Sequence, residues 1–121
     1  MLSNCSMHEL GIMESALALV EHHAAGHQNQ RVSRVVLRIG TLAGVEPEAL
    51  RFAFDVVSRG TLAEGAVFEI EVVAVVVYCL SCQQEFAGET DGFIFTCPTC
   101  GDLCGEILRG RELELSRIEM N

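Results

Sequence analysis

Apolar residues near the start of the chain recur at the spacing of an α-helix. Five of them are separated by three or four positions and form one stripe: Leu10, Met13, Leu17, Val20 and Ala24. Glu14, Glu21 and the two adjacent histidines fall largely away from this stripe. Gly26 can end the helix, because glycine readily adopts the conformation that follows a helix. The pattern therefore predicts an amphipathic helix over residues 10–24.

A strand and a second helix follow in the pattern. Residues 31–39 alternate between two sets, which are Val35, Leu37 and Ile39 on one face and Arg34, Val36 and Arg38 on the other. Pro47 suits the first turn of a helix, where its missing N–H costs nothing. An apolar stripe predicts this helix over residues 47–58, and it consists of Leu50, Phe54 and Val57. Arg59 and Gly60 end it.

Residues 67–78 predict one long strand. Its first half alternates, whereas residues 72–77 are almost continuously apolar, as in a strand that is covered on both faces. Glu69 and Glu71 can face the two arginines of the earlier strand from a neighbouring strand. Residues 112–118 alternate again until Ile118, where the phase slips and a bulge or a fraying end is expected.

The predicted order is helix, strand, helix, strand, cysteine-rich insert, strand. This order indicates an α+β fold, in which a small three-stranded sheet with two helices carries an inserted four-cysteine zinc lobe. We expect two parts. Residues 1–78 together with 109–121 would form the α+β unit, and residues 79–108 would form the lobe.

Composition and charge reduce the number of function classes that the chain can belong to. Half of the 121 residues are hydrophobic, and 17 acidic against 8 basic residues give a net charge of −9. Such a surface repels phosphate backbones, which argues against nucleic-acid binding, and it suits cationic partners such as metal ions. The longest apolar run is too short to span a bilayer, and residues 1–7 show no signal-peptide pattern. We therefore expect a cytoplasmic protein whose six cysteines are metal ligands or free thiols.

Four cysteines have the spacing of a metal site. Two CxxC motifs, Cys79 with Cys82 and Cys97 with Cys100, are separated by fourteen residues. Two such turns can place four thiolates at the corners of a tetrahedron, which is the geometry that zinc prefers. Gly101 relieves crowding where the second motif turns sharply. A redox dithiol, buried core cysteines and rubredoxin-like iron are the alternatives.

The predicted zinc site is structural. An all-thiolate shell leaves no open coordination position for hydrolytic catalysis. The insert is also too small to fold without a covalent or metal crosslink. Cys104 is either a buried thiol or a spare ligand, and we favour the thiol because four ligands are already present. Cys5 is expected to be an incidental free cysteine.

The four histidines all precede the first strand. His22 and His23 lie on the polar face of the first helix, and His27 lies in a loop, where solvated histidines are the ordinary case. His8 differs if Met7 is the first residue. A free α-amine, the next amide and a second-position imidazole can then chelate square-planar nickel or copper.

Four segments resemble the HypA/HybF family of hydrogenase maturation proteins. Residues 7–16, which begin Met7-His8-Glu9, resemble the start of that family. Residues 34–40 resemble its first strand, residues 44–54 resemble its second helix, and the paired CxxC motifs are similar to its zinc lobe. The resemblance covers about residues 7–120 in the right order.

This resemblance implies a nickel metallochaperone that is not an enzyme. His8 would be the main nickel ligand, joined by the α-amine of Met7, the backbone amide of Glu9 and the carboxylate of Glu46. Glu46 can equally be a helix N-terminal carboxylate that faces the helix dipole. The implied partners are a HypB-type GTPase and the large subunit of [NiFe]-hydrogenase, while the four cysteines would hold zinc.

The sequence departs from the family pattern at its start. Residues 1–6 precede the family's usual first methionine. With these residues present, Met7 has no free α-amine, and the nickel site loses a ligand or changes geometry. No histidine lies between Cys79 and Cys104, so proton-linked ligand exchange at zinc is not expected.

Two other functions are compatible with the residues. A zinc-ribbon interaction module would bind proteins without delivering nickel, and a thiol oxidoreductase would form a reversible disulfide between Cys79 and Cys82. Sheet edges and a hinged insert would also permit a homo-oligomer by domain swapping.

Overall fold

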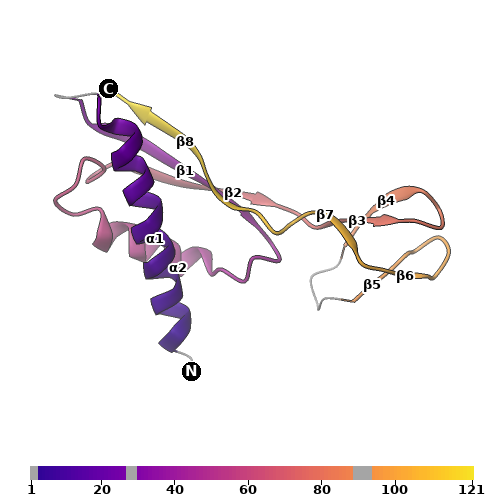
Figure 1. Cartoon of the computed structure of the whole chain (residues 1–121). Helices are drawn as coiled ribbons and strands as arrows, with labels where there is room; N and C mark the ends of the chain where they lie inside the picture. The colour runs from indigo at the N-terminus through magenta and orange to yellow at the C-terminus, as the bar shows by residue number, and fades with distance from the viewer. Residues whose placement is uncertain (1–2, 27–29, 89–93) are drawn as a thin grey trace. The chain divides into compact units, whose positions relative to one another are not determined.

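The computed structural model describes residues 3–26, 30–88 and 94–121, with helical side chains described from His8 onward. Within these residues the chain forms two helices and eight strands (Figure 1). In chain order they are α1 (Ser3–Ala24), β1 (Val32–Gly40), α2 (Pro47–Val57), β2 (Val67–Val73), β3 (Val76–Cys79), β4 (Gln84–Ala87), β5 (Phe95–Thr96), β6 (Leu103–Cys104), β7 (Glu106–Arg109) and β8 (Leu113–Met120). The α+β fold with an inserted four-cysteine lobe is confirmed.

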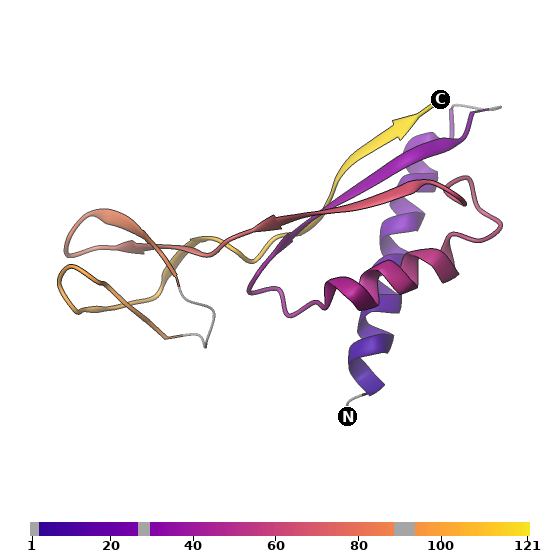
Figure 2. The same cartoon turned by 180° about the vertical axis from the view of Figure 1, so that it is seen from behind.

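The predicted three-stranded sheet has β1 at its centre. Its order is β2-β1-β8 (Figure 2). β8 runs antiparallel to β1, because backbone hydrogen bonds join Arg31 to Asn121 at one end and Gly40 to Glu112 at the other. α2 forms the connection from β1 to β2, as in other crossovers between neighbouring strands.

The two helices pack against each other and bury apolar side chains. The buried residues are Met13, Ala16, Leu17, Val20 and Ala24 of α1 and Leu50, Ala53 and Phe54 of α2. The ring of Phe54 also stacks on the ring of Phe68 in β2, with 4.8 Å between centroids. Such pairs add about 0.5–1.5 kcal/mol beyond burial. The predicted stripes are confirmed, although Leu10 and Val57 are only half-buried.

Charged residues on β1 pair with β2 as predicted. Arg34 forms an ion pair with Glu69, and Arg38 lies 3.3 Å from Glu71. The pairs follow the same order along both strands, as expected for parallel neighbours. Val36 lies between the two arginines on this face and is fully buried, since long aliphatic stems shield neighbouring apolar surface.

α1 begins at Ser3, earlier than the predicted start at residue 10. No proline or glycine interrupts residues 3–9, and serine and asparagine favour the start of a helix. Apolar periodicity marks only the part of a helix that packs on a core. The first two turns of α1, residues 3–9, therefore could not be predicted from the apolar pattern.

The prediction of one long strand over residues 67–78 is wrong. The chain forms β2 and β3, which are separated at Ala74 and Val75 and belong to different sheets. Val72 is 64% exposed, whereas Val75 and Val77 are buried. The apolar run therefore marks the passage from one sheet to the next, and it is not covered on both faces throughout.

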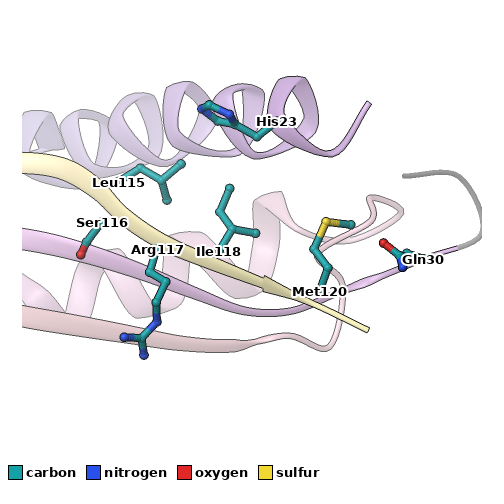
Figure 3. A pocket seen from close by; sticks show the side chains of 7 residues that line it. All are labelled: His23, Gln30, Leu115, Ser116, Arg117, Ile118 and Met120. Atoms are coloured by element: carbon teal, nitrogen blue, oxygen red, sulfur yellow. The ribbon is translucent and has the colours of Figure 1, made fainter. Parts of the chain in front are cut away.

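The phase slip in the last strand corresponds to a local irregularity of β8. Figure 3 shows Leu115 and Ile118 pointing toward α1, while the two residues between them, Ser116 and Arg117, both point away. Two consecutive side chains on one face require an extra residue in the strand, as in a β-bulge. The slip predicted at Ile118 is thus accounted for.

The inserted segment forms sheets that the pattern did not predict. β3 lies between β4 and β7 and pairs antiparallel with both, and β5 pairs with β6. Val75, Val77 and Phe95 form its small buried core. By contacts the chain divides into two compact units, one of Met1–Arg38, Val45–Glu71 and Glu114–Asn121 and another of Ile39–Gly44 and Val72–Leu113.

Two glycines in this second unit approach each other closely. A Cβ added at Gly40 would lie 2.1 Å from the carbonyl carbon and oxygen of Gly110. Gly110 has φ +119, and a Cβ there would lie 2.8 Å from Cα of Val75. The backbone segments at Gly40 and Gly110 can therefore lie this close together only because both residues lack a side chain.

We expect Gly40→Ala to destabilise the protein by about 3 kcal/mol, because backbone atoms cannot yield to the added methyl group. Gly11→Ala is the control, since its Cβ would meet no atom within 4 Å. It should stabilise α1 by about 0.5–1 kcal/mol through its higher helix propensity. Urea unfolding of both variants tests this, and equal stability of Gly40→Ala and the parent chain would contradict the close approach.

Candidate metal centre

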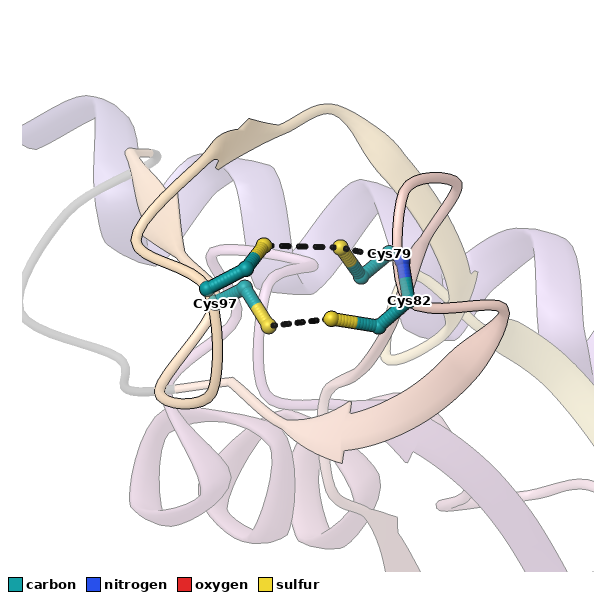
Figure 4. Close-up of side chains that lie close together, drawn as sticks. Cys79, Cys82 and Cys97 are labelled. Carbon is teal, nitrogen blue, oxygen red and sulfur yellow. Dashed lines mark hydrogen bonds between the residues drawn. The ribbon is translucent and has the colours of Figure 1, made fainter.

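The four cysteines of the CxxC motifs converge in the second unit. Their sulfur atoms all lie within 4.8 Å of one another, and they belong to Cys79, Cys82, Cys97 and Cys100. Cys79 and Cys100 are separated by 3.6 Å, and Cys82 and Cys97 by 3.9 Å, between sulfur atoms. Figure 4 shows the thiols of Cys79 and Cys82 facing those of the second motif across a short gap. The convergence predicted from the spacing is present.

Both motifs fold into the same type of turn. The N–H of Gln83 donates to the carbonyl of Cys79 at 2.7 Å, and the N–H of Gly101 donates to the carbonyl of Cys97 at 2.9 Å. The residue after each second cysteine has positive φ, +55° at Gln83 and +82° at Gly101. Gly101 was identified from sequence, whereas Gln83 was not. The matching spacing of the two motifs was the signal that could have found it.

Backbone N–H groups point at the sulfur atoms. The N–H of Cys82 donates to Sγ of Cys79 at 3.4 Å, and the N–H of Thr99 donates to Sγ of Cys97 at 3.4 Å. Bonds from the backbone of Cys100 and Thr99 lower the pKa of Cys97 to about 6. A hydrogen bond with Cys100 raises the pKa of Cys82 to about 12. The environment thus favours the thiolate form of Cys97 before any metal binds.

The sulfur positions fit a tetrahedral ion. With metal–sulfur bonds of about 2.3 Å, neighbouring sulfur atoms of such a site lie about 3.8 Å apart. The separations of 3.6 and 3.9 Å agree with this value. Zinc and iron both bind four thiolates at similar bond lengths, so the geometry defines a metal site without choosing between them.

Cys104 does not belong to this group of four. Sγ of Cys104 lies 3.5 Å from the carbonyl oxygen of Asp102, and burial followed by the nearby thiol of Cys79 raises its pKa to about 11. All five cysteines whose side chains are described are free thiols. The side chain of Cys5 lies outside the described residues.

Two of the four proposed nickel ligands are main-chain nitrogen atoms, those of Met7 and Glu9, so the positions of side-chain ligand atoms do not test this site. Among the described residues, no other group of three potential ligand atoms from His, Cys, Asp or Glu lies together. His8 and Glu46 are both exposed, and the side chain of Met7 lies outside the described residues. Glu46 is the N-cap of α2, but its side chain makes no capping hydrogen bond.

Glu9 links the two helices in a way that sequence reasoning missed. It is only 1% exposed, and its Oε2 accepts a hydrogen bond from the N–H of Glu46 at 2.8 Å. Its Oε1 is buried without a partner among the described residues. The signal was available, because Glu9 lies four residues before Met13 and so falls on the apolar stripe of α1.

The histidines near the end of α1 are exposed as predicted. His23 lines a cavity of about 480 Å³ beside β8 (Figure 3). Its lining is mixed, with Leu115, Ile118 and Met120 as the apolar residues and Gln30, Ser116 and Arg117 as further polar ones. It holds no cluster of metal ligands among the described residues. His27 lies outside the described residues.

Comparisons with known proteins agree with this architecture. Residues 7–120 match the family model described as hydrogenase/urease nickel incorporation, metallochaperone, HypA. The hydrogenase maturation factor HypA of Roseiflexus sp. is 47% identical over 113 residues, which are 93% of this chain and 91% of the relative. HypA of Acidithiobacillus ferrooxidans is 41% identical over 94% of this chain and 99% of the relative.

The fold is similar to solved structures of the same family. The solution structure of the Ni metallochaperone HypA from Helicobacter pylori matches with a TM-score of 0.63 and 27% identity, over 93% of this chain and 96% of that one. Another HypA solution structure matches with a TM-score of 0.67 and 25% identity, over 95% and 97%. The sequence, the fold and the four-cysteine site therefore agree that this chain belongs to the HypA family.

Proposed function

We propose that this chain is a nickel metallochaperone that delivers nickel during maturation of [NiFe]-hydrogenase and holds a structural zinc ion. The observation that carries the proposal is the family match over residues 7–120 together with the converged four-cysteine site. The alternative of a zinc-ribbon interaction module without nickel delivery finds no support in the comparisons. The protein would act in the cytoplasm without catalysing a reaction. No helix within the described residues is long and apolar enough to cross a membrane.

Cys79, Cys82, Cys97 and Cys100 would hold the zinc ion. Zinc has no redox chemistry, and four thiolates saturate it, so its contribution would be to crosslink the lobe. The lobe needs such a crosslink, because among its described residues only Phe95 and the two ligands Cys79 and Cys97 are buried. Zinc binding and folding of residues 79–108 would therefore be one process, separate from the folding of residues 1–78 and 109–121.

Nickel would bind at the start of α1 as cargo. His8 is exposed there and free to act as a ligand, and the N-cap of α2 lies close by because Glu9 binds the N–H of Glu46. The carboxylate of Glu46 would complete a site formed by the imidazole of His8, the backbone amide of Glu9 and the α-amine of Met7. An acidic side chain at this N-cap would also face the dipole of α2.

The position of the first residue decides which nitrogen atoms are available. In the 121-residue chain α1 starts at Ser3, so the N–H groups of residues 7–9 lie inside the helix, where they bond to preceding carbonyls. In a chain that starts at Met7, these groups are the first of the helix and have no helical partner. The α-amine and the following amides would then be free to close chelate rings around nickel.

The delivery partners would be a HypB-type GTPase and the hydrogenase large subunit. We place the GTPase contact on α1 over residues 10–24. Leu19 on this helix is 49% exposed, and its neighbours one turn away include the polar residues Ser15, His22 and His23. An exposed apolar side chain with a polar surround is typical of a protein contact.

Cys97→Ser should release zinc and unfold the lobe, because three thiolates and a hydroxyl bind zinc more weakly than four thiolates. Hydrogen exchange should lose protection mainly over residues 79–108, while α1, α2 and β1 stay protected. Metal analysis should show stoichiometric zinc in the parent chain and little in the variant. Cys104→Ser is the control and should keep its zinc. Uniform loss of protection would contradict the two-part description, and stoichiometric iron in the parent would contradict zinc.

A chain that starts at Met7 should bind nickel more tightly than the 121-residue chain, because only the shorter chain offers a free amine beside His8. His8→Ala should weaken nickel binding of the shorter chain by at least about tenfold. His22→Ala is a matched control on the same helix and should have no effect. Calorimetric titration measures all four proteins. Equal affinity of the two starts would exclude the amine as a ligand, and unchanged affinity of His8→Ala would refute the site.

Leu19→Asp should weaken binding of a purified HypB-type GTPase by about tenfold, because it places a charge in an apolar contact. Leu80→Asp changes a leucine of the lobe that is more exposed, at 71% against 49% for Leu19, and should leave this affinity unchanged. Calorimetry with the zinc-loaded chain tests the placement. Loss of binding with Leu80→Asp alone would move the contact to the lobe.

A further inference from the structure

The second unit carries a groove beside its metal site. The groove encloses about 280 Å³ and lies between the first CxxC turn and the segment that follows the second one. We call it the lobe groove and define it by the residues whose side chains decide its character: Tyr78, Leu80, Ser81, Asp102, Leu103 and Glu106. The proposed zinc ligand Cys79 and the free thiol Cys104 also line the groove, whereas the six defining side chains belong to neither proposed metal site.

The apolar part of the lobe groove is open to solvent. Leu80 is 71% exposed and Leu103 is 76% exposed, which are among the highest values for large apolar residues in the described chain. Leu80 lies between the two cysteines of the first CxxC turn, in which the N–H of Cys82 donates to the sulfur of Cys79. The high exposure of Leu80 shows that its side chain points outward from this turn. Two leucines exposed on the wall of one groove mark a surface that gains free energy when a partner covers it.

The charge of the lobe is of one sign. Residues 79–108 hold five of the 17 acidic residues and none of the eight arginines or four histidines of the chain, which contains no lysine. Within the groove, Asp102 and Glu106 are exposed, and no cationic side chain of the described residues forms an ion pair with either. Asp102 accepts a hydrogen bond from Ser81. Four thiolates around a divalent ion would add further negative charge beside the groove.

We propose that the lobe groove binds a cationic and apolar segment of a partner protein, in which arginine or lysine alternates with leucine-like residues. The apolar side chains would cover Leu80 and Leu103, and the cationic groups would meet Asp102 and Glu106. Nucleic acids and anionic membranes do not fit this surface, because their phosphate groups carry the same charge as the groove. The proposal requires the folded lobe but not nickel binding.

The test uses two synthetic peptides of equal length, one alternating leucine with arginine and one alternating leucine with glutamate. Calorimetry with the zinc-loaded chain should show binding of the arginine peptide only. Leu80→Ser and Leu103→Ser should each weaken it about tenfold, and Glu106→Lys by a similar factor that shrinks at high salt. Leu19→Ser and Glu14→Lys on α1 are the matched controls and should change the affinity less than about twofold.

Two further measurements keep the outcomes separate. Zinc content should be unchanged in every variant, and amide shifts on adding the peptide should be confined to the lobe groove. If Glu14→Lys and Glu106→Lys weakened peptide binding equally, the proposal would be overturned. The peptide would then be attracted by the net negative charge of the whole protein and not by the lobe groove. Self-association that Leu80→Ser abolishes would make a second copy the occupant and would also overturn it. Nickel affinity of Leu80→Ser stays at the parent value if the lobe groove and the nickel site are independent.

Discussion

The convergence of four thiols is the constraint on which the second unit depends. Three fully buried side chains, Val75, Val77 and Phe95, supply too little apolar burial to fix the short strands around them. The two CxxC turns bring their sulfur atoms to separations of 3.6 and 3.9 Å. One N–H···S hydrogen bond within each turn supports this arrangement. A metal ion bound by these four thiols would join two hairpin turns that are distant in sequence.

The first unit is stabilised in a different way. Its helices bury continuous apolar stripes, and the ring of Phe54 stacks on Phe68 across the crossover from α2 to β2. The opposite face of the sheet is held by ion pairs between Arg34 and Glu69 and between Arg38 and Glu71. These pairs are partly exposed, so each contributes little stability, but like charges on facing strands would be unfavourable. The arrangement of opposite charges on β1 and β2 therefore favours these two strands as neighbours.

Sequence reasoning succeeded where a long periodic signal exists. The two helical stripes and the alternation in β1 predicted the elements of the first unit, and the regular CxxC spacing predicted the thiol cluster. It failed for β4, β5, β6 and β7, because strands of two to four residues are too short to show alternation. It also joined β2 to β3, since an apolar run does not reveal that the chain changes sheets at Val75. The close pair Gly40 and Gly110 depends on tertiary contact and leaves no local trace.

The buried carboxylate of Glu9 has a consequence for folding cooperativity. Its Oε2 accepts a hydrogen bond from the N–H of Glu46, the N-cap residue of α2, while its Oε1 has no partner among the described residues. Burying a carboxylate costs free energy that only this bond offsets, and the bond exists only when α1 and α2 are docked. Neither helix therefore gains from partial docking at this point. Glu9 therefore favours full docking of the two helices over a partly docked state, and it ties the chain segment that carries His8 to the start of α2.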